Sequence, residues 1–186
     1  MKRIGILLLL AAALAGCGES DEAAAPAPPT LAGGALPDLE SRTRTLDAEA
    51  VADDSLEPEQ LAAVLDDASF QRGSEREFFG KTKTFDHVVA RILRFADAEG
   101  ADRYLGWFGE HPDDFLGTSG PAEVETPGDS GVVFRLVPCG SCKKELPTFL
   151  AGWRHGAVVA TLLASGSGAN EERFAALARE LDEAIG

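Results

Sequence analysis

Residues 148–164, TFLAGWRHGAVVATLLA, are the stretch that decides the fold. Residues 148–154 and 158–164 are rich in apolar and β-branched side chains, which is typical of strands. His155-Gly156 between them predicts a two-residue hairpin turn, because glycine accepts a positive φ at no steric cost. Since the second strand does not alternate apolar with polar residues, we expect both faces of its sheet to be covered.

Segments upstream of this hairpin predict further strands. Residues 132–137 predict the strand that precedes it, and residues 75–79 and 85–95 predict two earlier ones, the second rich in Val, Ile, Leu and Phe. We also expect a short strand at residues 123–125, before a turn at Pro127-Gly128-Asp129. These strands follow one another with short connections, as they do in an antiparallel sheet.

Three other segments carry apolar side chains at helical spacing. Residues 58–69 predict a helix that ends by Gly73, and residues 97–108 predict a second helix with Asp97 as its cap. Residues 170–185 predict the third and most amphipathic helix. Its apolar stripe consists of Phe174, Leu177, Ala178, Leu181 and Ile185.

Strands joined by hairpins, with helices before, between and after them, predict an α+β fold. An antiparallel sheet would have helices packed on it, and because both of its faces are covered, we expect an α/β/α sandwich. Residues 38–186 are enough for a single domain that buries about 70% of its unfolded surface. Residues 38–54 are acidic and poorly patterned, and we expect them to be an extended lead-in.

The first 17 residues have the pattern of an export signal. Lys2 and Arg3 are followed by an apolar run, residues 4–14, which is shorter than the roughly 20 residues that span a bilayer. The ending Leu14-Ala15-Gly16-Cys17 resembles the lipobox of bacterial lipoproteins, which are cleaved just before the cysteine and carry fatty acids such as palmitate on it. The resemblance implies that residues 1–16 are a signal peptide and that Cys17 is the lipid attachment site.

This resemblance also implies a location. The domain would be anchored by lipid to the extracytoplasmic face of the cell membrane. Gly18, in place of an aspartate after the cysteine, resembles lipoproteins that are sent on to the outer membrane of bacteria with two membranes. A soluble secreted protein, whose signal happens to end near a cysteine, is the alternative.

Residues 18–37, GESDEAAAPAPPTLAGGALP, are small and rich in proline. A segment of this kind cannot bury enough surface to offset the entropy lost on ordering. We therefore expect residues 17–37 to be the lipidated cysteine followed by a disordered tether. A coil of this length spans roughly 25 Å, which would hold the domain away from the membrane.

The charge of the chain excludes some classes of partner. The net charge is −14, and removal of residues 1–16 would take away two basic residues and no acidic ones. We therefore expect no nucleic-acid partner and no docking on anionic lipids through a basic patch. The partners that we expect are the membrane, through the lipid on Cys17, and either a small apolar ligand or an envelope protein.

Cys139-Gly140-Ser141-Cys142 is the one constellation that invites a catalytic interpretation. In an exported protein these two cysteines predict a disulfide, with Gly-Ser between them as a tight turn. The string CGSCKKELP also resembles the thioredoxin active site, which implies Cys139 as a nucleophile and Cys142 as a resolving thiol. Against that, the chain has no proline beyond Pro147 to supply the cis-proline loop of that family.

Other candidates indicate ordinary structural roles, and we expect no metal and no cofactor. The three histidines are far apart and have no zinc-ligand spacing: His87, His111 and His155. Asp113-Asp114 lacks the alternating oxygen ligands of a calcium loop, and residues 165–168, SGSG, lack the lysine and length of a P-loop. Trp107 and Trp153 are expected to pack in the core.

The order of elements over residues 86–186 resembles a known group. RFADAEGADRYL, then GWRHGAVVATLL, then a helix ending ARELDEAIG, is similar to the secreted PsbP-like lipoproteins and kinase sensor domains of actinobacteria. The resemblance implies an α/β sandwich and assigns no binding residue. The sequence thus favours a non-catalytic, membrane-anchored domain that binds a ligand or a partner. A tethered thiol–disulfide oxidoreductase using Cys139 and Cys142, and a structural accessory subunit of an envelope complex, remain alternatives.

Overall fold

The hairpin of residues 148–164 lies at the centre of one sheet. The computed structural model describes residues 30–137 and 145–185. Their strands are β1 (Glu40–Leu46), β2 (Phe70–Phe79), β3 (His87–Phe95), β4 (Ser119–Pro121), β5 (Ser130–Leu136), β6 (Thr148–His155) and β7 (Val158–Ser165). The strand order is β1-β2-β3-β7-β6-β5-β4, with every neighbouring pair antiparallel, so β7 is the central strand.

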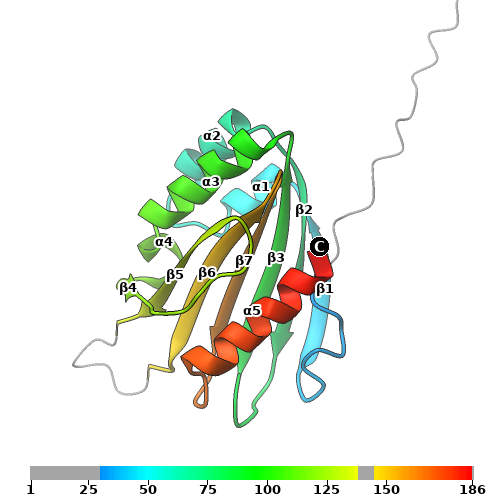
Figure 1. Ribbon diagram of the computed structural model, residues 1–186, viewed down its shortest axis with the longest axis vertical. Coiled ribbons are helices and arrows are strands. Elements are labelled where there is room, and N and C mark those ends of the chain that lie inside the picture. Colours follow the sequence, from blue (N-terminus) through cyan, green and yellow to red (C-terminus); the bar gives the residue numbers. More distant parts are fainter. Residues whose placement is uncertain (1–29, 138–144, 186) are drawn as a thin grey trace, which may run out of the picture.

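Helices cover both faces of this sheet. The helices are α1 (Ala48–Ala52), α2 (Pro58–Asp67), α3 (Ala98–Glu110), α4 (Asp113–Leu116) and α5 (Glu171–Ile185). Helix α5 lies on one face, which we call the α5 face, and α1 to α4 lie on the other, which we call the four-helix face (Figure 1). The α+β fold with an antiparallel sheet is confirmed, and its layers are those of an α/β/α sandwich.

The central strand explains why both faces need a cover. Ala160 and Leu162 of β7 belong to the core on the α5 face, and Val159 belongs to the core on the four-helix face. Side chains alternate between the faces of a strand, so an apolar residue at nearly every position requires apolar partners on both sides. The turn between β6 and β7 is Gly156-Ala157, one residue later than predicted, and Gly156 has a φ of +52°.

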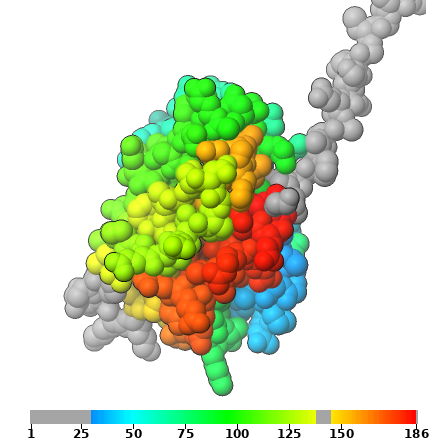
Figure 2. Space-filling model, viewed as in Figure 1, coloured from blue at the N-terminus to red at the C-terminus, as the bar shows by residue number. Residues whose placement is uncertain are grey.

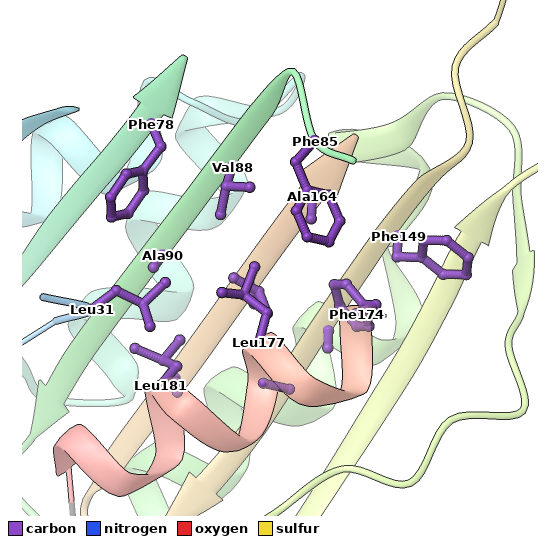
Figure 3. Close-up of a cluster of buried hydrophobic side chains, with 14 of the residues drawn as sticks. Leu31, Phe78, Phe85, Val88, Ala90, Phe149, Ala164, Phe174, Leu177 and Leu181 are labelled. Atoms are coloured by element: carbon purple, nitrogen blue, oxygen red, sulfur yellow. The ribbon is translucent and has the colours of Figure 1, made fainter. Parts of the chain in front are cut away.

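On the α5 face, the apolar stripe predicted for residues 170–185 packs on the sheet. Figure 3 shows Leu177 and Leu181 pointing at the strands, and Phe149 of β6 stacks on Phe174 with ring centroids 5.3 Å apart. Figure 2 shows the segment between β4 and β5 lying beside α5 on this face, where Val124 packs against the same core. Leu31 is 1% exposed and also belongs to this core, although it falls within the predicted tether.

On the four-helix face, α3 packs closely against the sheet. The predicted cap is confirmed, because the Asp97 carboxylate accepts a hydrogen bond of 2.8 Å from the amide of Gly100. Gly152 of β6 lies under the helix, where an added Cβ would come within 2.8 Å of the Phe108 ring and 3.2 Å of Leu105. A glycine is therefore what allows α3 to approach the sheet.

The structure differs from the sequence-based expectation at the N-terminal end of the domain. Residues 38–54, expected to be an extended lead-in, form β1 and α1. Strand β1 is at an edge of the sheet and its residues from Glu40 to Thr45 are exposed, so no apolar alternation marks it. Gly73 lies inside β2 rather than after a helix, and an added Cβ there would come within 2.7 Å of the Leu93 side chain.

Two further differences lie between α3 and β5. Residues 113–116 form the short helix α4, and the short strand of this region is β4 (119–121) rather than residues 123–125. Ala122 and Val124 are held instead by apolar contact with the core on the α5 face. Burial of alternate side chains thus produced a strand-like pattern in a segment that joins no ladder.

Candidate functional site

A row of polar side chains crosses the sheet on the four-helix face. The register places Arg44 of β1 opposite Glu75 of β2, Glu75 opposite Arg91 of β3, and Arg91 opposite Thr161 of β7. Gly152 of β6 completes the row. Directly opposite residues have Cβ atoms about 5 Å apart, so opposite charges in such a row pair with each other.

The charged half of this row is a closed cluster. Arg44 Nε donates to Glu75 Oε1 at 2.7 Å, and Arg91 Nε donates to Glu75 Oε2 at 2.6 Å. The carboxylate of Asp54, from the loop between α1 and α2, accepts hydrogen bonds from both arginines, at 2.7 Å in the case of Arg44. We call these four residues the ion cluster. Each carboxylate is shared by the two guanidinium groups.

The contacts of the ion cluster favour the charged forms of Glu75 and Arg44. Burial raises the pKa of Glu75, but the hydrogen bond from Arg44 and the charge of Arg91 outweigh that effect, and the pKa lies below its usual value of 4.5. The hydrogen bond to Glu75 raises the pKa of Arg44, against the opposing effect of desolvation. Glu75 is 3% exposed, so its charge depends on these two partners.

A pocket opens where the ion cluster meets α3. Its volume is about 200 Å³. Its floor is made by β3, β6 and β7, its wall by α3 and α4, and its rim by Asp54. The lining residues are Asp54, Val89, Arg91, Tyr104, Phe108, Phe115, Leu150, Thr161 and Leu163. Six of the nine lining residues are apolar or aromatic and the other three are polar or charged, a mixture found in small-molecule sites.

Two hydroxyl groups in this lining have no partner within the described part of the chain. Tyr104 is 2% exposed and Thr161 is 6% exposed, yet neither hydroxyl makes a hydrogen bond to any residue in 30–137 or 145–185. Burial raises the pKa of Tyr104 to about 12, with the charge of Arg91 acting in the opposite direction. Within the described part of the chain, neither hydroxyl oxygen is among the fully buried atoms that lack a hydrogen bond, so both are open to the pocket, where water or a ligand can bond to them.

The rim of the pocket is closed by a contact between helix α4 and the loop that carries Asp54. Ser55, next to Asp54, contacts the Asp114 carboxylate of α4 at 3.3 Å through its Oγ. The same α4 contributes Phe115, whose ring lies 5.3 Å from Phe108. The wall of the pocket is thus one connected aromatic cluster that continues into α3.

The arrangement suits binding. The lining described here includes no histidine, cysteine or serine that could act as a nucleophile or as its base. The charged groups of the ion cluster pair with one another. Within residues 30–137 and 145–185, no group of three His, Cys, Asp or Glu side chains is placed to hold a metal ion.

The cysteines that the sequence singled out are not part of this pocket. Cys17, Cys139 and Cys142 lie outside the described residues. The nearest strands before and after the Cys139–Cys142 pair in the chain are β5 and β6, which are adjacent and antiparallel. The lipid on Cys17 and the disulfide stay predictions.

The structure places the three histidines apart, each in a local contact. His87 Nε2 lies 2.8 Å from a carboxylate oxygen of Glu77, and His155 Nε2 lies 2.6 Å from Asp182 of α5. His111 Nδ1 lies 2.8 Å from the carbonyl of Trp107, which fixes Nδ1 as the protonated nitrogen. Trp107 and Trp153 are buried, as expected.

Other polar motifs from the sequence also serve the fold. Asp113 Oδ1 accepts a hydrogen bond from the amide of Ser119 at 2.9 Å, which joins α4 to β4. In the segment before α5, the amide of Gly166 donates to the carbonyl of Pro147 at 3.2 Å. The Asn170 side chain then caps the helix by accepting from the amide of Arg173 at 2.9 Å.

Sequence reasoning missed the pocket and the ion cluster. The signal that could have found the cluster is the alternation of charge in two strands, R-x-R at residues 42–44 and E-x-E at residues 75–77. No comparable signal marks Tyr104 or Thr161. Tyr104 fits the apolar stripe of a helix and Thr161 fits a strand, so neither stands out as a site residue.

The molecule is an antiparallel α/β/α sandwich with one aromatic-walled pocket at the row described above. Among the described residues, no helix is long and apolar enough to cross a membrane. No protein-family model matches the chain, and no curated protein matches it in sequence. The chain is similar in structure to the extracellular domain of PknH from Mycobacterium tuberculosis, with a TM-score of 0.53 and 10% identity over 78% of this chain and 86% of that one. At that identity the likeness is one of fold.

Proposed function

We propose that the chain is an extracytoplasmic lipoprotein whose sandwich domain binds a small, largely apolar molecule in the pocket beside α3, without catalysing a reaction on it. The leader ending in Leu14-Ala15-Gly16-Cys17 supports export and anchoring through Cys17. The likeness to an extracellular domain supports the same side of the membrane.

The observation that carries the binding function is the composition of the pocket. Apolar side chains from three strands and aromatic rings from two helices surround it, and Tyr104 places a buried hydroxyl among them. A cavity of about 150 Å³ lined by apolar side chains is large enough to bind benzene. The pocket, at about 200 Å³, is therefore large enough for one substituted ring.

Toluene is the probe for this function. Residues 18–186 contain every described residue, and their methyl NMR spectrum can be followed as toluene is added. We expect saturable shifts of the Val89, Leu150 and Leu163 methyl groups, with a Kd of about 1 mM or tighter.

The control uses two matched substitutions. Leu163→Phe fills the pocket and should abolish these shifts, whereas Leu146→Phe, at an exposed position, should leave them intact. Shifts that are absent from the pocket methyl groups, or that survive Leu163→Phe, would reject the proposed function.

A further inference from the structure

The hydrogen-bonding groups of the pocket that are left for a ligand can all act as donors. Arg91 uses Nε and Nη2 on the ion cluster, and its Nη1 donates to no group in residues 30–137 or 145–185. An arginine can only donate. The Tyr104 and Thr161 hydroxyls, each without a partner in the same residues, line the pocket with it. The hydroxyls can also accept, but Arg91 can only donate, so an acceptor oxygen is the ligand group to which any of the three can bond.

The charges around the pocket are balanced. Arg44 and Arg91 share Glu75 and Asp54, so two positive and two negative groups form a closed set. A ligand with a formal charge would lose its hydration in the pocket and meet no net countercharge. The protein as a whole carries −14, which further disfavours an anion.

The aromatic and aliphatic side chains of the pocket determine which shape of ligand fits. Phe108 and Phe115 have ring centroids 5.3 Å apart, and Tyr104 lies 6.2 Å from Phe108 in a stacked arrangement. Opposite them are the aliphatic side chains of Leu150 and Leu163. A flat ring between an aromatic wall and an aliphatic floor makes contact on both of its faces.

We propose that the pocket selects an uncharged ring compound that carries a hydrogen-bond acceptor such as a carbonyl oxygen, recognised by Tyr104, Thr161 and Arg91. The inference rests on the proposed binding function and adds the class of ligand. It excludes carboxylates and ammonium ions of the same size.

Four probes of similar size test the ligand class: benzamide, benzoate, benzylamine and toluene. At pH 7 benzoate is an anion and benzylamine a cation, while benzamide is neutral and carries the carbonyl. We expect benzamide to bind residues 18–186 at least 10-fold more tightly than either charged probe, with shifts at the same methyl groups. Equal or tighter binding of benzoate or benzylamine would overturn the proposed ligand class.

Two substitutions test the recognising groups. Tyr104→Phe and Thr161→Val remove one hydroxyl each and keep the shape, so each should weaken benzamide by about 3- to 10-fold. Toluene, which has no acceptor, should bind both variants as it binds the wild type, and this result also shows that they are folded. Thr45→Val, at an exposed position of β1, should change neither probe.

The outcomes separate the two proposals. If toluene binds in the pocket and benzamide is no tighter than benzoate, or is unaffected by Tyr104→Phe and Thr161→Val, the ligand class is wrong and the binding function stands. If none of the four probes shifts the pocket methyl groups, both proposals are rejected.

Discussion

Glu75 is the residue on which the ion cluster depends. It is nearly fully buried and accepts hydrogen bonds from Arg44 and Arg91. Removal of one partner from a buried ion pair leaves an uncompensated charge, which costs about 3–5 kcal/mol. Glu75 also bonds Arg91, which lines the pocket, so the same carboxylate supports both the fold and the site.

The stability that Glu75 contributes should depend on pH. Its pKa is lower in the folded state than the usual 4.5, so the contribution is fully present above pH 4.5 and is lost as pH falls through the folded-state pKa. In Glu75→Gln that contribution is absent at every pH. Urea unfolding from pH 3 to pH 6 should therefore show the wild type more stable at pH 6, with the difference shrinking below about pH 4.5. A difference that stays constant across this range would contradict the assignment.

The cysteine pair is the other feature at the scale of single residues, and its C-x-x-C spacing is the sequence signal that marks it. Cys139 and Cys142 stand between two strands that the structure pairs, β5 and β6. The Gly-Ser turn predicted between the cysteines favours a structural disulfide, and so does the expected export of the protein. Because neither cysteine is among the described residues, this disulfide stays a prediction.

At the scale of elements, the packing of α3 on the sheet makes this helix a wall of the pocket. The helix itself was predictable, because Asp97 and the apolar spacing of Ala101, Tyr104 and Phe108 are local features. The distance between α3 and the sheet was not predictable, because it depends on Gly152, about 50 residues away in the chain. Strand β1 was missed for a related reason, because its Arg–Glu pairs exist only once β2 lies beside it.

Two Gly→Ala substitutions test whether the packing of α3 depends on its close approach to the sheet at Gly152. Gly152→Ala would push a Cβ against the rings of α3, and we expect a loss of about 1–3 kcal/mol from overpacking. Gly106→Ala, on the exposed side of α3 with no atom within 4 Å of the added Cβ, should instead stabilise by about 0.5–1 kcal/mol through helix propensity. Chemical denaturation of both variants measures the difference. Similar changes in the two variants would show that α3 does not depend on a close approach at Gly152.

At the scale of the whole molecule, the folded domain includes residues that composition alone assigns to a tether. Residues 30–37 are mostly small, like those before them, yet Leu31 packs beside Leu181 and Ala90 (Figure 3). If Cys17 is lipidated, the residues between it and the first buried leucine are 18–30 rather than 18–37.

Leu31→Ala measures whether this packing matters. Truncation of a fully buried leucine costs about 2–5 kcal/mol, and a chain that begins at residue 38 should lose a similar amount relative to one that begins at residue 30. Leu56→Ala is the control, because Leu56 is 74% exposed and its truncation should change stability by about 0.5 kcal/mol or less. Thermal and urea unfolding of these chains give the comparison. Equal stability of Leu31→Ala and Leu56→Ala would remove Leu31 from the core.

The sequence by itself determined the class of the fold: the central hairpin, the helix of residues 170–185, the α3 helix and the covering of both sheet faces. These follow from local features, namely the 2-residue and 3.6-residue periods of apolar side chains and the residues that cap and turn the chain. Only the tertiary structure decided the pocket, the ion cluster and the place of Leu31. Each of these joins residues from elements far apart in the chain, through register, close approach or burial, and such contacts leave no periodic trace in any one segment.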